Sequence, residues 1–154
     1  MNGADTAFVL ISAALVMLMT PGLALFYGGM VRVKSALNML MMSFISLGVV
    51  TVLWVLYGYS LTFGGDIGAG LLGNLDLIGL RGFSADTLTG GEEGVPVLAF
   101  AAFQLMFAVL TPALMSGALA DRVRFTGWTL FVALWATAVY FPVAHLYGDR
   151  KSVV

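Results

Sequence analysis

The chain contains no cysteine, only one histidine and few charged residues, and each shortage excludes a class of protein. Without cysteine there is neither a disulfide framework nor a thiolate metal site. Eight carboxylates and the single His145 leave too few groups for a metal cluster or a paired-carboxylate catalyst, so we expect no metal site, no cofactor and no enzymatic activity. A net charge of -1 without a compact basic cluster excludes a nucleic-acid partner as well.

Apolar residues dominate the composition instead. They make up 60% of the chain against 10% charged residues, where soluble domains carry roughly 25% charged residues. The mean hydropathy is +1.00. Four uncharged runs cover residues 7–31, 36–63, 95–120 and 125–146, and each is long enough for a helix to cross a hydrocarbon core of roughly 30 Å. We therefore expect an all-α integral membrane protein with four transmembrane helices.

The first run, residues 7–31, differs from a cleaved signal peptide, because it is too long and follows Asp5 instead of a basic start. We interpret it as the first transmembrane helix. Its glycines, Gly22, Gly28 and Gly29, offer flat surface. We favour helix packing as their role over direct contact with a transported species.

Residues 64–94 differ from the four runs in composition. The segment is rich in glycine and carries five acidic residues against the single Arg81. Its length and polarity predict an extramembrane loop, with a short surface helix around Leu71 to Leu80. The five acidic residues are Asp66, Asp76, Asp86, Glu92 and Glu93.

Basic residues lie in the two short turns between the runs, and they predict the orientation. Arg32 and Lys34 occupy the first turn, and Arg122 and Arg124 the other, so all four lie on one side of the membrane. The positive-inside rule places that side in the cytoplasm. We therefore expect a multi-pass protein of the cytoplasmic membrane with its amino terminus and the 64–94 loop outside.

Aromatic residues gather toward the outer side of the second and third runs. Trp54, Tyr57 and Tyr59 stand where amphipathic rings favour the membrane interface. In the third run Phe100, Phe103 and Phe107 have i, i+3, i+7 spacing, which predicts one aromatic helix face with Gln104 beside it. Such a stripe is most often plain packing. The alternative is an aromatic lining for a species that crosses the membrane.

Three segments go beyond composition. They are TPGLALFYGGMVRVKSALNMLM (residues 20–41), FQLMFAVLTPALMSGALADRVRF (103–125) and FVALWATAVYFPVAH (131–145). Together they resemble the opening third of the Amt/Mep/Rh ammonium transporter family, and in particular its Amt branch. The resemblance runs in register through all four spans. It implies the first part of an eleven-helix channel fold and a homotrimer whose subunits each have a narrow, mostly apolar pore.

The resemblance also implies roles for individual residues. Phe103 matches a phenylalanine of the outer vestibule, Phe107 the outer member of a phenylalanine gate, and Gln104 the glutamine between them. His145 matches a histidine at the end of this span and neither of the two pore histidines, so we expect it to be an interfacial or packing residue. The implied partners are ammonium or ammonia, the lipid bilayer, further copies of the chain, and a PII-type regulator on the cytoplasmic face.

Physical chemistry gives these ring positions a reason. Ammonium carries a full charge, so the loss of its water in an apolar channel is costly. A ring face at the mouth offsets roughly 0.5 to 2 kcal/mol of that cost through its quadrupole, which Phe103 would supply. Phe107, one turn deeper, would exclude water and hydrated ions by bulk, as a hydrophobic gate does. Deprotonation would then discriminate against potassium, because ammonia crosses an apolar pore.

The end of the chain departs from the family pattern. Where the family continues with a vestibule tryptophan and a glycine-rich turn, this chain has Tyr147 and Gly148, followed by DRKSVV. We expect residues 1–148 to be a partial ammonium transporter domain and 149–154 a non-family tail, with a sequencing artefact as the hypothesis for its origin. The chain would then be a fragment that does not conduct alone. Two alternatives stay open: a membrane ammonium-sensing domain of a signalling protein, and a non-conducting membrane assembly module.

Overall fold

The computed structural model describes residues 3–67, 70–84, 86–89 and 94–149. It confirms the four predicted spans, since four of its helices are long and apolar enough to cross a membrane, at Gly3–Met30, Val33–Phe63, Val97–Leu119 and Phe125–Gly148. Two of the spans are interrupted by other helix types. The helical elements are α1 (Gly3–Met30), α2 (Val33–Leu53), η1 (Trp54–Gly58), α3 (Tyr59–Phe63), α4 (Val97–Ser116), η3 (Gly117–Leu119), α5 (Phe125–Trp135), η4 (Ala136–Tyr140) and α6 (Phe141–Asp149).

The interruptions are two π-turns, which the hydropathy of the sequence does not reveal. In η1 the backbone N–H of Tyr59 donates to the carbonyl of Trp54, and in η4 that of Phe141 donates to Ala136. Each bond spans five residues instead of four, so each turn holds one residue more than an α-helical turn. The second and fourth spans are therefore each a longer helix, a π-turn and a short helix at the strand-bearing end.

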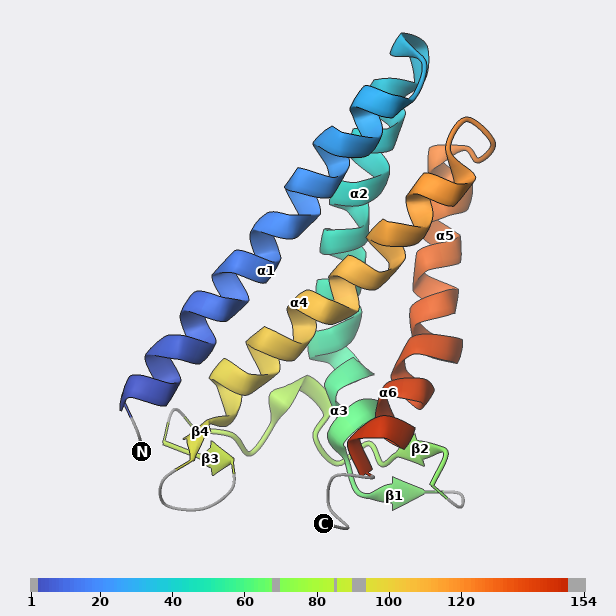
Figure 1. The fold of residues 1–154 in the computed structure, drawn as a ribbon. Helices are drawn as coiled ribbons and strands as arrows, with labels where there is room; N and C mark the ends of the chain where they lie inside the picture. Colours follow the sequence, from blue (N-terminus) through green and yellow to red (C-terminus); the bar gives the residue numbers. More distant parts are fainter. Residues whose placement is uncertain (1–2, 68–69, 85, 90–93, 150–154) are drawn as a thin grey trace.

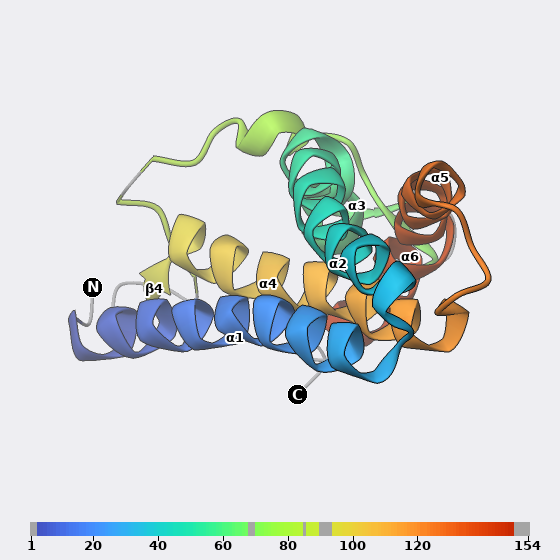
Figure 2. The ribbon, with the colours of Figure 1, turned by 90° about the horizontal axis from the view of Figure 1, so that it is seen from above.

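The four spans pack as a bundle around α2 and α4. Helices α1 and α4 lie side by side and run in the same direction, while α2 and α5 return (Figures 1 and 2). On α1 the small residues Ala13, Thr20 and Ala24 are buried. Of the predicted packing glycines, Gly28 lies near Leu40 of α2, whereas a Cβ added at Gly22 or Gly29 would meet nothing within 4 Å.

The loop of residues 64–94 forms two small antiparallel ladders on the described residues. Strand β1 (Asp66–Ile67) pairs with β2 (Leu72–Gly73), and β3 (Leu88–Thr89) pairs with β4 (Val95–Pro96). The expected surface helix around Leu71 to Leu80 is wrong except for the 3₁₀ turn η2 (Ile78–Leu80). The helix is absent because the chain lies flat against α3 at Gly73. A Cβ added at Gly73 would lie 2.5 Å from the Ser60 carbonyl oxygen. Glu92 and Glu93 lie outside the described residues.

Serine 60 fastens this loop to the membrane-spanning part. Its hydroxyl donates to the Asn74 carbonyl at 2.7 Å and accepts the Leu77 N–H at 3.0 Å. The Ser60 side chain is fully buried, so both bonds are shielded from water. The first part of the loop is therefore held against α3.

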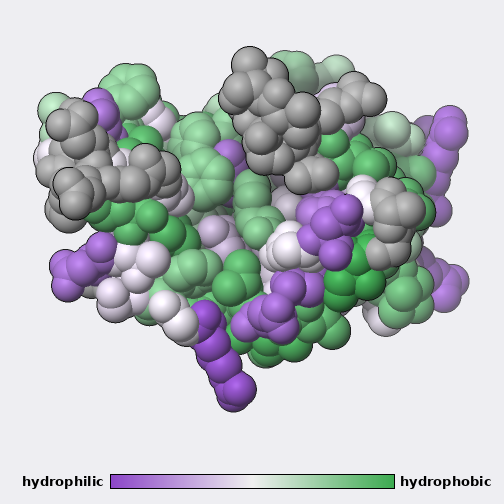
Figure 3. Space-filling model, turned by 90° about the horizontal axis from the view of Figure 1, so that it is seen from below, coloured by the Kyte–Doolittle hydropathy of each residue, from purple (hydrophilic) through white to green (hydrophobic). Residues whose placement is uncertain are grey.

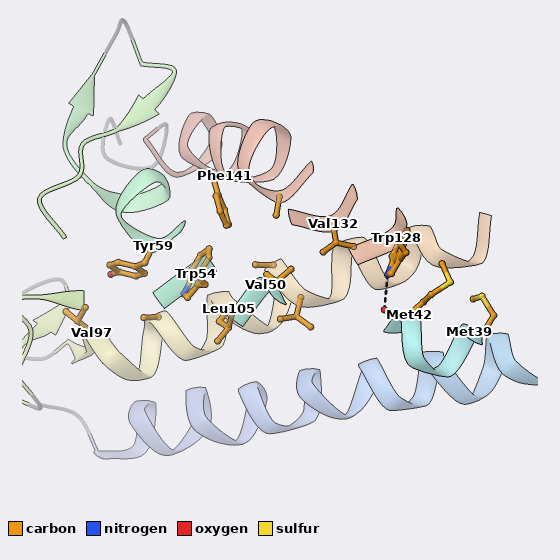
Figure 4. Close-up of a cluster of buried hydrophobic side chains, with 14 residues drawn as sticks. Met39, Met42, Val50, Trp54, Tyr59, Val97, Leu105, Trp128, Val132 and Phe141 are labelled. Atoms are coloured by element: carbon orange, nitrogen blue, oxygen red, sulfur yellow. Dashed lines mark hydrogen bonds between the residues drawn. The ribbon is translucent and has the colours of Figure 1, made fainter. Parts of the chain in front are cut away.

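A cluster of buried apolar side chains runs along the bundle axis (Figure 4). Met39, Met42 and Trp128 lie at one end of this cluster, and Trp54, Tyr59 and Phe141 lie at the other. Trp54 and Tyr59 are only 2% and 5% exposed. These two rings therefore pack inside the protein, Trp54 against Phe63 and Phe141, and Tyr59 against Phe63.

Charge divides the two ends of the bundle as the sequence predicts. The turns with Arg32, Lys34, Arg122 and Arg124 lie at the end opposite the strands and the amino terminus (Figure 1). Figure 3 views the strand-bearing end, where hydrophilic residues are scattered among apolar ones. Of the predicted tail 149–154, Asp149 continues α6, and residues 150–154 lie outside the described part of the chain.

Candidate functional site

The aromatic stripe of the third span lies in the first three turns of α4, close to the strand-bearing end. Phe103 and Phe107 contact each other edge to face, with ring centroids 5.2 Å apart and planes at 75°. Phe107 is 39% exposed and Phe103 is half-buried. The two predicted ring residues are thus brought together as a pair on one face of α4.

Phe100 takes a different partner. Its ring lies 5.3 Å from that of Phe63 on α3, with the planes at 69°. The stripe therefore divides: its first ring joins α4 to α3, and the next two contact each other along α4. Packing explains Phe100, whereas Phe107 keeps an uncovered ring.

Gln104 enters a pocket of about 430 Å³ between the second, third and fourth spans. Phe103 and Phe107 do not line this pocket, so the structure joins the two rings to each other and places the predicted glutamine beside them, in a separate hollow. The lining residues come from α3 and η1, from α4, and from η4 and α6. They are Trp54, Thr62, Phe63, Phe100, Gln104, Tyr140, Ala144, Tyr147 and Gly148.

Trp54 and Tyr140 are pocket residues that sequence reasoning missed as site candidates. The Trp54 Nε1 is buried without a hydrogen-bond partner among the described residues. Tyr140 lines the pocket and also a second one of about 310 Å³ that contains Thr111. Their aromatic character was the signal in the sequence, but nothing in it placed them beside Gln104.

Tyr140 also lies near the turn of α4 that follows the ring pair, because it lines the second pocket together with Thr111. The Thr111 hydroxyl donates to the carbonyl of Phe107 at 2.8 Å. Thr111 therefore lies between the end of the π-turn η4 and the residue that carries the exposed ring.

His145 is buried in the middle of α6, in agreement with its expected packing role. It is 4% exposed, and its Nδ1 lies 2.9 Å from the carbonyl oxygen of Thr62. Its Nε2 lies 3.7 Å from Oδ1 of Asp66, a carboxylate that is about half exposed. The histidine therefore ties α6 to α3 and to strand β1, and it does not line the pocket of Gln104.

The chemistry available at this end is that of ring faces, hydroxyls and one amide. Within the described ranges no group of three or more His, Cys, Asp or Glu side chains could hold a metal ion. Ring faces attract a small cation through their quadrupole, and an amide oxygen accepts its hydrogen bonds. The arrangement suits contact with a small cation.

Comparison with known proteins places the chain in a family. A sequence model described as the Ammonium Transporter Family matches residues 7–153, a range that takes in most of the predicted tail. Among curated relatives, the ammonium transporter of Mycobacterium tuberculosis is 56% identical over 94% of this chain. The ammonium transporter of Bacillus subtilis is 48% identical, also over 94%. The chain spans 33% and 35% of the length of these two relatives, or about a third.

Solved structures agree with the sequence comparison. The crystal structure of Mep2 from Saccharomyces cerevisiae superposes with a TM-score of 0.81 at 34% identity, over 94% of this chain and 32% of that one. Mep2 from Candida albicans gives a TM-score of 0.78 at 33% identity, over 94% of this chain and 31% of that one. The sequence and structural comparisons agree, and the chain belongs to the ammonium transporter family.

Proposed function

We propose that this chain forms the outer approach of an ammonium/ammonia channel-type transporter, as part of a longer subunit. The observation that carries the proposal is the edge-to-face pair of Phe103 and Phe107 beside Gln104, on one face of a membrane span, in a member of this family. Ring faces offset part of the cost of removing water from ammonium. The subunit transports its substrate without an enzymatic step.

The two rings have different roles in this proposal. Phe103 contributes a ring face that receives the cation from the outer solution. Phe107 follows one turn deeper, and its bulk and apolar surface exclude water and hydrated metal ions. Gln104, on the adjoining face of α4, offers an amide oxygen to a donor such as ammonium.

The orientation follows from the charges at the two ends. The four basic residues of the inner turns face the cytoplasm by the positive-inside rule, and the amino terminus and the strands lie outside. The protein is then a multi-pass component of the cytoplasmic membrane. A homotrimer with a PII-type regulator at the cytoplasmic end, which the family resemblance implies, also belongs to this proposal.

The test uses a chimeric channel in which residues 7–148 replace the matching third of the Bacillus subtilis ammonium transporter. Uptake of methylammonium and exclusion of potassium are measured in cells that lack their own transporters. Phe103→Ala is expected to raise the half-saturating methylammonium concentration by about twofold to thirtyfold, as the loss of roughly 0.5–2 kcal/mol of cation–π attraction predicts. Phe107→Ala is expected to alter gating and admit potassium.

Phe44→Ala is the matched control. Phe44 is an exposed phenylalanine of α2, 52% exposed, so the same truncation removes a ring outside the proposed site. Unchanged uptake and unchanged potassium exclusion in both Phe103→Ala and Phe107→Ala would refute the assigned roles.

A further inference from the structure

The two π-turns lie opposite each other and are joined by a hydrogen bond. Tyr57 of η1 and Thr137 of η4 place their hydroxyl oxygens 2.8 Å apart. Thr137 also donates to the carbonyl of Ala133 at 2.8 Å, which uses its only proton. Tyr57 must therefore be the donor in the bond between the turns, and a chain of two hydrogen bonds runs from η1 to the last turns of α5.

Packing around this bond leaves little freedom. Gly58 of η1 faces the ring of Phe141, and a Cβ added at Gly58 would lie 2.5 Å from Cζ of that ring. Phe141 is fully buried, and its ring meets that of Tyr57 at 6.0 Å with planes at 87°. The two π-turns are thus interlocked at one depth of the bundle.

The π-turn η4 changes which residues of the fourth span face inward. Buried residues occur at Trp128, Val132 and Ala136 with a step of four, and then at Phe141 with a step of five. The extra residue offsets the outer helix by about 100° relative to an uninterrupted α-helix. Residues after the turn therefore meet the bundle with a different face, the face on which Tyr140 and Ala144 line the pocket of Gln104.

We propose that Tyr57 and Thr137 are positioning residues for ammonium entry: by joining the two π-turns they fix Trp54 and Tyr140, and with them the wall of the Gln104 pocket. Neither residue lines the pocket, so each acts through others. This inference rests on the proposed function of Phe103, Phe107 and Gln104 as the outer approach.

The transport test compares Tyr57→Phe and Thr137→Val in the chimeric channel with two matched controls. Tyr27→Phe removes another interhelical tyrosine bond, from its hydroxyl to the Leu114 carbonyl at 3.1 Å near the inner end. Thr129→Val removes a threonine hydroxyl that bonds only the Phe125 carbonyl in its own helix. Both positioning variants are expected to raise the half-saturating methylammonium concentration about threefold to tenfold, the scale of one lost hydrogen bond, while the maximal rate stays within about twofold.

Rescue separates positioning from plain stability. Thr137→Ser retains the hydroxyl and is expected to restore the half-saturating concentration, with all variants present in the membrane at equal amounts. If Tyr57→Phe and Tyr27→Phe shift half-saturation equally, or if Thr137→Ser behaves as Thr137→Val, the proposal is overturned.

A second readout does not require transport. The chain has no cysteine, so Ala144→Cys adds a single thiol to this part of a chimera whose other cysteines are replaced. Tyr57→Phe is expected to change its reaction rate with a membrane-impermeant, charged methanethiosulfonate by about threefold or more, and Tyr27→Phe is not. A chimera that shows this difference but takes up no methylammonium would refute the proposed function and support the positioning role. Equal labelling in both variants contradicts the positioning role.

Discussion

The two ends of the bundle are built differently. At the end with the basic turns, which is the inner end in the proposed orientation, short turns join the spans, and Trp128 donates its indole N–H to the Met42 carbonyl at 2.9 Å from a fully buried position (Figure 4). At the outer end, π-turns interrupt two spans, and strands replace short turns. The pocket of about 430 Å³ and the Phe103–Phe107 pair are also in the outer half.

The difference shows where regular packing yields to a site. Regular helical spacing and one large buried ring, that of Trp128, are enough to form a close-packed inner end. The outer end instead holds ring faces and an amide beside a pocket. Because the pocket leaves these side chains with fewer packing neighbours, specific polar contacts must hold the surrounding segments in place. Ser60 and His145 provide such contacts on the loop side, and Tyr57 and Thr137 provide them between the spans.

The largest effect on the free energy of unfolding is expected from removing the Trp128 ring. Trp128→Ala deletes a fully buried side chain and its hydrogen bond, and should lower the free energy of unfolding by about 3–5 kcal/mol. Denaturant unfolding of the purified chimeric channel measures it. Trp135→Ala, at a half-buried position, is the control and should cost less. Equal losses would contradict an inner end that depends on Trp128.

Substitutions at two glycines, one at each end of the bundle, compare how tightly the two ends are packed. At Gly58 a Cβ meets the fully buried Phe141 ring, and at Gly117 it meets the half-buried Tyr27 ring at 2.6 Å. Because only Tyr27 has room to swing away, Gly58→Ala should cost about 1–3 kcal/mol and Gly117→Ala less. The same unfolding measurement applies. Gly48→Ala, where a Cβ meets nothing within 4 Å, should be neutral or stabilising by up to about 1 kcal/mol.

The contact of His145 with the outer loop should have an intermediate effect. His145→Leu leaves the Thr62 carbonyl without its imidazole partner and should cost about 1–2 kcal/mol. Asp66→Asn should cost about 1 kcal/mol or less, because Asp66 is about half exposed and lies 3.7 Å from the ring nitrogen. The denaturant midpoints of the two variants show which substitution costs more stability. A larger loss for Asp66→Asn would mean that the contact of His145 with Asp66 contributes more to stability than its contact with Thr62.

The smallest effect is expected at the inner turn. Asn38 donates from Nδ2 to the Val123 carbonyl at 3.5 Å, at the limit of a hydrogen bond, so this interhelical bond is long. Asn38→Ala should change the free energy of unfolding by about 0.6 kcal/mol or less. A loss as large as that of His145→Leu would show that polar contacts matter equally at both ends.

Much of this fold could be predicted from the sequence because a membrane imposes simple rules. Uncharged runs of sufficient length gave the four spans, and basic turns gave their common end. Helical spacing gave the Phe103–Phe107 pair correctly. It could not give the partner of Phe100, since the contact with Phe63 depends on how two spans meet.

The π-turns and the pocket escaped prediction for a related reason. Hydropathy averages over many residues, so one extra residue at Ala136–Tyr140 leaves it unchanged. Only the five-residue step from Ala136 to Phe141 records the turn, and that step is recognisable once burial is known. Trp54 and Tyr140 join Gln104 in one pocket through packing of distant segments, which spacing within one run does not encode.

An experimental structure of the chimeric channel, determined with methylammonium, tests the central claim most directly. We predict that the rings of Phe103 and Phe107 face a conduit inside the subunit, with Gln104 and Tyr140 in the wall beside them. Rings that face the surrounding lipid, with no passage next to α4, would contradict it.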